Sequence, residues 1–246
     1  SSVESVIAAA LKVKPDVRIV VKSTVPVGIT AGLRERHPGA TIIFSPEFLR
    51  EGFAVTDTLH PDRIVYGLPD DPDRAEVGRE LLDECYAGLL GSGIPRLLTN
   101  HPTAELVKVA ANSFLATKIS FINAMAQLCD ATGGDVTQFA EAIGYDDRIG
   151  RKFLRAGVGF GGGCLPKDIR AFMARAGELG VDEALTFLRE VDAINLRQRD
   201  KAVELAAKLL DDHFVCVETK LLRQAHSLTS AILKDFRCFL CDHLPK

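Results

Sequence analysis

Val17-Arg18-Ile19-Val20-Val21, followed by the turn Ser23-Thr24-Val25-Pro26, begins a regular alternation of strand and helix. The short apolar run is typical of a buried strand, and the turn leads into a helix that we expect to end near His37, before Pro38-Gly39. Other segments continue the alternation: strands at 41–44, 63–67 and 95–98, and helices at 2–13 and 73–90. Strands that alternate with helices predict an α/β fold with a parallel sheet, which binds ligands at the carboxyl ends of its strands.

The second part of the sequence is predicted to be helical. A long helix is expected from Pro102 to about Ala131, capped by His101 or Thr103 and ended by Gly133-Gly134. Further helices are predicted at 136–143, 166–179 and 182–210. We therefore expect an α/β domain over 1–100, a helical domain over 101–211 and a separate tail over 212–246.

One cysteine follows a run of glycines in Phe160-Gly161-Gly162-Gly163-Cys164-Leu165-Pro166-Lys167-Asp168. The glycines permit positive φ and a close approach of another molecule, and Pro166 suits the first turn of a helix. A thiol at this junction is close to the positive end of the helix dipole and to Lys167, and both favour the thiolate. The segment fits a covalent nucleophile, and it equally fits a glycine-rich turn with a buried cysteine.

Four blocks resemble the UDP-glucose/GDP-mannose dehydrogenase family in order and spacing. They are Lys22–Gly28, Ser45–Gly52, Ala104–Lys108 with Ala111-Asn112, and Asp147–Gly150 continuing through Phe153-Leu154 and Ala156-Gly157 to Gly159–Asp168. The resemblance covers roughly residues 1–210 and is strongest to bacterial UDP-glucose 6-dehydrogenases. It implies a partial Rossmann-type NAD-binding sheet (1–100), followed by a mostly α-helical central domain that carries the catalytic cysteine (101–211) and contains a long helix at a dimer interface.

The resemblance also implies a chemistry. NAD would oxidise the C6 alcohol of UDP-glucose to the carboxylate of UDP-glucuronate through a thiohemiacetal and a thioester on Cys164. Lys108 and Asn112, four residues apart on one helix face, would stabilise the alkoxide. The implied catalytic residues are Cys164, Lys108, Asn112, Asp168, Thr24 and Glu51. The implied cofactor-binding residues are Thr24, Glu51 and Lys167. The implied substrate-binding residues are Glu47, Phe48, Leu49, Arg50, Lys108, Asn112, Phe160 and Gly161.

Simpler roles exist for several of these residues. Thr24 can cap the helix that follows it. Glu47 and Glu51 can be surface carboxylates, Lys167 can be solvated, and an i, i+4 pair such as Lys108 and Asn112 is commonly an exposed polar stripe.

Two parts of the family pattern are absent. No Gly-x-Gly-x-x-Gly turn follows a strand, so we expect the chain to lack the family's first half-domain. After Asp211-Asp212 the sequence departs from the family's last domain. Cys238-x-x-Cys241 with His243 is weak support for zinc without a second spaced pair, and we predict no metal site.

Composition excludes several other classes of protein. The 246 residues are 47% hydrophobic and carry a net charge of −3, which does not favour a nucleic-acid or acidic-membrane partner. No apolar run is long enough to span a membrane, and six scattered cysteines indicate reduced thiols in a cytoplasmic protein. We expect a homodimeric UDP-glucose dehydrogenase. The alternatives are a dehydrogenase for GDP-mannose or a UDP-N-acetylhexosamine, and an inactive dimerisation fragment.

Overall fold

The structure is a computed structural model that describes residues 2–209. It divides into two compact units, which join in sequence between Ala111 and Asn112. The first unit contains a sheet covered by helices, and the second consists of helices.

The sheet of the first unit has four strands in the order β1-β2-β3-β4. They are β1 (Arg18–Val21), β2 (Thr41–Phe44), β3 (Ile64–Leu68) and β4 (Arg96–Asn100). Five helices accompany them: α1 (Ser2–Val13), α2 (Ile29–Arg36), α3 (Ala54–Leu59), α4 (Pro72–Cys85) and α5 (Ala87–Gly91). The predicted alternation of strands and helices is confirmed, except that α3 was not predicted and the helix at 73–90 is two helices that meet at Tyr86.

The sheet is mixed, and this corrects the prediction of a parallel sheet. The pairs β1–β2 and β3–β4 are parallel, but β2 and β3 are antiparallel and pair only between Phe44 and Gly67. A parallel connection normally needs a crossover helix that packs on the sheet. The connection over 45–63 contains only the short helix α3, which buries none of its residues. The chain therefore returns alongside β2 in the opposite direction.

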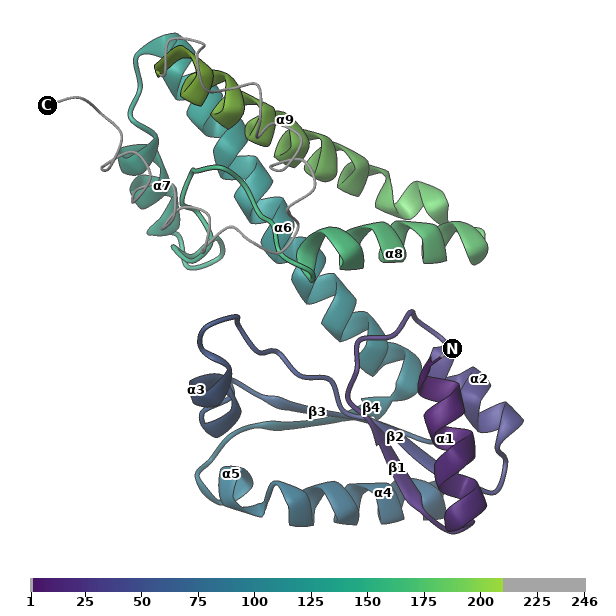
Figure 1. The fold of residues 1–246 in the computed structure, drawn as a ribbon. Coiled ribbons are helices and arrows are strands. Elements are labelled where there is room, and N and C mark those ends of the chain that lie inside the picture. The colour runs from purple at the N-terminus through teal and green to yellow at the C-terminus, as the bar shows by residue number, and fades with distance from the viewer. Residues whose placement is uncertain (1, 210–246) are drawn as a thin grey trace, which may run out of the picture. The chain divides into compact units, whose positions relative to one another are not determined.

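Both faces of the sheet are covered (Figure 1). On one face, Ile42, Phe44 and Val65 form a core with residues of α1 and α2. On the other face, Ile43, Ile64 and Tyr66 pack against Leu82 of α4 and partly buried residues of α5. Because neighbouring residues of a strand point to opposite faces, these short apolar strands contribute to both cores.

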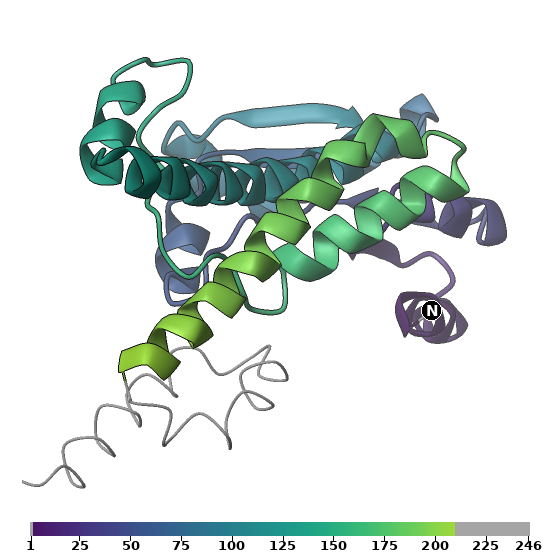
Figure 2. The same cartoon turned by 90° about the horizontal axis from the view of Figure 1, so that it is seen from above.

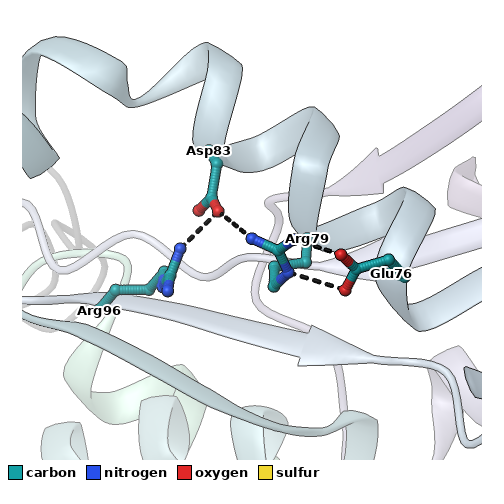
Figure 3. A network of polar contacts seen from close by, with 4 residues as sticks. All are labelled: Glu76, Arg79, Asp83 and Arg96. Carbon is teal, nitrogen blue, oxygen red and sulfur yellow. Dashed lines mark hydrogen bonds and ion pairs between the residues drawn. The ribbon is translucent and has the colours of Figure 1, made fainter.

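A chain of ion pairs links α4 to β4 (Figure 3). Arg79 binds the carboxylates of Glu76 and Asp83 on its own helix, and Arg96 of β4 binds the same Asp83. Burial raises the pKa of Asp83, but its bonds to Arg96 and Arg79 outweigh this effect and hold the pKa below the usual value. The network therefore favours the ionised carboxylate between helix and strand.

The long helix α6 (His101–Thr132) begins in the first unit and continues into the second. Its predicted bounds were correct to within a residue, but its cap was not, because the side-chain oxygen of Asn100 accepts the hydrogen bond from Thr103 N. His101 instead is buried and donates from Nε2 to the carbonyl of Ile42, 2.9 Å away. The start of α6 is thereby attached to β2.

The second unit contains the rest of α6 and the helices α7 (Val136–Gly144), α8 (Leu165–Glu178), η1 (Asp182–Leu185) and α9 (Thr186–Leu209). Figures 1 and 2 show α8 and α9 side by side, with η1 between them in sequence. Their core contains Ala116 of α6, Ile169 of α8 and Leu188 and Val191 of α9, together with Phe160 from the loop before α8.

Two further properties concern the whole described part of the chain. None of its helices is both long and apolar enough to cross a membrane. Its three cysteines, Cys85, Cys129 and Cys164, are free thiols, and the other three lie outside the described residues.

Candidate active site

Two of the predicted site segments follow parallel strands. Thr24 lies beyond the carboxyl end of β1, and Glu47 lies beyond the carboxyl end of β2. Because these strands are parallel, both segments leave the sheet at the same edge. Thr24 is half-buried and does not cap α2, so its simpler role is not supported. The helix is capped by Glu105 of α6, whose carboxylate accepts from Gly28 N at 2.6 Å and Thr30 N at 2.9 Å.

Lys108 is the most deeply buried cation of the first unit's site segments. It is 5% exposed, and its Nζ lies 3.3 Å from Oε1 of Glu47 and 5.4 Å from the ring centre of Phe48. The guanidinium of Arg63 lies 4.0 Å from the same ring. The aromatic ring thus stabilises two cations, and Lys108 is not the exposed polar residue of the alternative interpretation.

The rest of the segment 47–51 is more open. Glu47 accepts from the backbone N–H of Leu49 at 2.7 Å. The Arg50 guanidinium donates to both carboxylate oxygens of Asp57, and these bonds lower the pKa of this carboxyl to about 2. Leu49 and Glu51 are exposed, and Glu51 has no hydrogen-bond partner within residues 2–209. The structure therefore joins Glu47, Phe48 and Lys108, and leaves Glu51 free at the surface.

In the second unit, Cys164 is the exposed N-cap residue of α8. Its carbonyl accepts from Asp168 N at 2.8 Å, the first hydrogen bond of the helix, and Pro166 occupies the first turn as predicted. The thiol is exposed, so the alternative of a buried structural cysteine is wrong. A thiol at a helix N-terminus is near the positive end of the dipole, which suits a nucleophile.

Asp168 lies in the first turn of α8, four residues after Cys164, and is 3% exposed. Its Oδ2 accepts from Nδ2 of Asn112 on α6 at 2.7 Å, and its Oδ1 lies 2.8 Å from Nζ of the exposed Lys167. Both carboxylate oxygens therefore have donors, and Asn112, Lys167 and Asp168 form a connected group at the start of α8. Lys167 is accordingly not merely solvated.

The glycine-rich loop before Cys164 is held by residues that the sequence analysis did not single out. Asn195 of α9 binds both the N–H and the C=O of Phe160, and Arg199 donates to the same carbonyl. Asn123 of α6 accepts from Gly157 N at 2.8 Å. These partners lie 34 to 39 residues away in the sequence, and no local pattern indicates them.

The described part of the chain contains no group of three or more His, Cys, Asp or Glu side chains placed to hold a metal ion. Cys238, Cys241 and His243 lie outside the described residues.

The comparisons with known proteins agree with the resemblance seen in the sequence. Residues 1–89 match the NAD binding domain of the UDP-glucose/GDP-mannose dehydrogenase family, and residues 102–197 match its central domain. A UDP-glucose 6-dehydrogenase of Rickettsia typhi is 44% identical over 203 residues, covering 81% of this chain and 45% of the relative.

Two solved structures have the same fold. A UDP-glucose dehydrogenase from Pyrobaculum islandicum superposes with a TM-score of 0.70 at 40% identity, over 79% of this chain and 45% of that one. A GDP-mannose dehydrogenase from Pseudomonas aeruginosa superposes with a TM-score of 0.52 at 29% identity, and the match covers 84% of this chain and 49% of that one. The chain thus spans less than half the length of the relatives that it matches. With matches to two successive domains of one family, the chain belongs to the UDP-glucose/GDP-mannose dehydrogenase family.

Proposed function

We propose that this chain supplies the catalytic residues of an NAD-dependent UDP-glucose 6-dehydrogenase, which converts the C6 alcohol of UDP-glucose to the carboxylate of UDP-glucuronate. The observation that carries the proposal is the exposed thiol of Cys164 at the N-terminus of α8, whose first turn carries the Asp168 carboxylate that is held by Asn112 and Lys167. This arrangement joins a nucleophile to a fixed carboxylate within one turn of helix. The names of the relatives support the choice of substrate, because the chain is 44% identical to a UDP-glucose 6-dehydrogenase and 29% identical to a GDP-mannose dehydrogenase.

Cys164 carries the second oxidation in this proposal. The first oxidation turns the alcohol into an aldehyde, and the thiolate then adds to the aldehyde carbon to give a thiohemiacetal. Loss of a hydride from that carbon gives a thioester, and water cleaves the thioester to the carboxylate and the free thiol. The exposure of Cys164 gives the substrate access to the sulfur atom.

NAD, when bound, accepts the hydride that is lost in each oxidation. The segments after β1 and β2 fit its nicotinamide side, because Thr24 and Glu51 have no hydrogen-bond partner within residues 2–209 and keep their polar atoms for a ligand. The N-terminus of α2 does not fit a phosphate, since Glu105 already occupies its N–H groups at Gly28 and Thr30. We therefore assign Thr24 and Glu51 to cofactor binding at the nicotinamide end, and we assign Lys167 to the cofactor through the resemblance alone.

Lys108 and Asn112 are assigned to the oxygen atom that becomes negative during the reaction. The three N–H donors of the Lys108 ammonium have one carboxylate in ion-pair range within the described residues, that of Glu47, so donors remain for a substrate oxygen. Asn112 already gives one N–H to Asp168 and has a second to offer. Donors that are already in place stabilise the alkoxide as its charge develops.

The carboxylates are assigned to proton transfer and to the nucleotide sugar. Asp168 orients the water that cleaves the thioester, and Glu51, which is exposed and unpaired in the described part of the chain, is our candidate base for this step. Glu47, Phe48, Leu49, Arg50, Phe160 and Gly161 are assigned to the substrate through the resemblance. The long helix α6 is assigned to a homodimer interface on the same basis.

The test is to mix the purified chain with NAD and UDP-glucose and to follow NADH by absorbance. We expect two NADH per UDP-glucose, and no carboxylate product from Cys164→Ser. GDP-mannose and UDP-N-acetylglucosamine are assayed in parallel. If either one is turned over faster, that nucleotide sugar is the substrate in place of UDP-glucose. A folded chain that yields no NADH with any of them would contradict activity of this chain and favour the dimerisation fragment, which light scattering would then detect as a dimer.

A further inference from the structure

Asn195 of α9 makes an unusual contact with the loop that precedes Cys164. Its Oδ1 accepts from Phe160 N at 2.7 Å, and its Nδ2 donates to Phe160 O at 3.0 Å. The side-chain amide thereby pairs with the backbone as a neighbouring strand would, and the two bonds fix which amide atom is the oxygen. Asn195 is 1% exposed, so water does not compete for these bonds.

Arg199, one helical turn further along α9, reinforces this contact. Its Nη2 donates to the same Phe160 carbonyl at 2.7 Å, so this oxygen accepts two hydrogen bonds. The Phe160 ring is also buried in the core of the second unit. Backbone and side chain of this one residue are therefore both fixed to α9.

The backbone conformation of the neighbouring Gly159 leaves room for this contact. Gly159 has φ 92°, a conformation that L side chains rarely adopt, and a Cβ added there would overlap Oδ1 of Asn195. Earlier in the loop, Gly157 N is held by Asn123. The stretch 157–160 is thus attached to two helices, and only Gly161, Gly162 and Gly163 separate it from Cys164.

We propose that Asn195, supported by Arg199, is a positioning residue that holds Phe160 and thereby sets where Cys164 stands at the N-terminus of α8. Glycines have no side chain to restrain the chain, so the short run 161–163 cannot locate the thiol without a fixed point before it. Phe160 is that fixed point, and Leu165, the first residue of α8, is the fixed point after it. The catalytic part of this inference rests on the proposed function, whereas the placement of Cys164 is measurable without turnover.

The decisive variant is Asn195→Asp, which keeps the size of the side chain and an acceptor for Phe160 N but turns a carboxylate oxygen toward Phe160 O. Ser120→Ala is the matched control. Ser120 is also 1% exposed and joins α6 to α9 through a 2.7 Å bond to the carbonyl of Val191, without touching the loop. Both variants remove one buried hydrogen bond in the same unit, and only one of them affects Phe160.

Three measurements on the full chain test the proposal. Hydrogen–deuterium exchange of peptides covering 157–163 should become at least about tenfold faster in Asn195→Asp and stay at the wild-type rate in Ser120→Ala. Alkylation of Cys164 by iodoacetamide, relative to that of the exposed Cys85, should change at least threefold in Asn195→Asp only. Turnover of UDP-glucose should fall about 100-fold in kcat, because a small displacement of a reacting group costs that much, with an unchanged KM for NAD.

The outcomes separate the two proposals. If wild type makes no NADH, the proposed function fails for this chain, and exchange and alkylation still decide whether Asn195 positions Cys164. If Asn195→Asp leaves exchange and alkylation at wild-type values, or if Ser120→Ala changes them equally, Asn195 has only a structural role. A fall in kcat without a change in the loop would likewise overturn the positioning role.

Discussion

Lys108 in the first unit and Asp168 in the second are both buried charges, but they are compensated very differently. Asp168 has a donor on each carboxylate oxygen, at 2.7 and 2.8 Å. Lys108 has one half-exposed carboxylate at 3.3 Å and the face of one aromatic ring. A buried charge that is fully paired is fixed in place, whereas one with free donors retains affinity for an added anion. The difference indicates a rigidly held carboxylate at Asp168 and a ligand-binding cation at Lys108.

This comparison predicts its largest effect, a loss of activity, for the variant Lys108→Met. Methionine has a similar length and no charge, and the partner left behind, Glu47, is partly exposed to water. We expect the free energy of unfolding to change little, because water can solvate the Glu47 carboxylate that loses its partner. We expect kcat to fall about 100- to 1000-fold, as on the loss of one oxyanion donor. Steady-state NADH kinetics and denaturant unfolding measure the two effects.

Lys12 is an exposed residue of α1, and Lys12→Met is the control for the loss of a lysine charge in the same unit. Equal activity in Lys108→Met and Lys12→Met would contradict the assignment of Lys108 as a ligand-binding cation.

A smaller effect, on stability, is expected in Asp168→Asn. The substitution keeps the volume but removes the charge and one acceptor, which leaves the amide of Asn112 facing another amide. Hydrogen bonds to charged groups contribute roughly 1.5–3 kcal/mol each, so we expect the free energy of unfolding to fall by about 2 kcal/mol in urea titrations. Lys167→Met removes only the exposed partner, and it should cost below about 1 kcal/mol. Equal losses in both variants would contradict the tight hold of the buried Asp168 carboxylate.

The smallest expected effect concerns the pH dependence of stability, which should differ between the two units. Burial lowers the pKa of His101 below its ordinary value of 6.5. The unfolded chain therefore binds a proton at a higher pH than the folded chain does. The stability that depends on neutral His101 is complete above about pH 6.5 and decreases as the pH falls below it.

Residues 112–209 contain no histidine, so protection against hydrogen exchange, relative to the intrinsic rate at each pH, should fall from pH 7 to 5 in the first unit and not in the described part of the second. His101→Gln, which keeps a donor for the Ile42 carbonyl, should flatten this dependence. An unchanged acid response in that variant would assign the effect to another group.

The sequence predicted the elements of the fold well and their pairing less well. Strands and helices were located to within a few residues, because burial repeats along the chain with the period of each element. The direction of β3 was not predictable in the same way. It depends on the path of residues 45–63, whose polar and apolar residues give no clear period and whose only helix buries no side chain.

The candidate site was predictable where its residues are adjacent in sequence. Cys164, Lys167 and Asp168 lie within five residues, and Lys108 and Asn112 lie one helical turn apart. The residues that hold these groups were not predicted. Glu105 binds N–H groups 75 and 77 residues away, and Asn195 binds a backbone 35 residues away. Neither contact leaves a local pattern, because any buried glutamate or asparagine can serve as such a partner.

The outer strand β4 affects how the protein should behave at high concentration. β4 is the last strand in the sheet order, so within the described residues one side of its backbone has no ladder partner. Leu97 and Leu98 on this strand are 49% and 47% exposed. Unpaired edges with apolar side chains are where the sheets of separate molecules join. Self-association of purified protein is therefore expected to begin at β4.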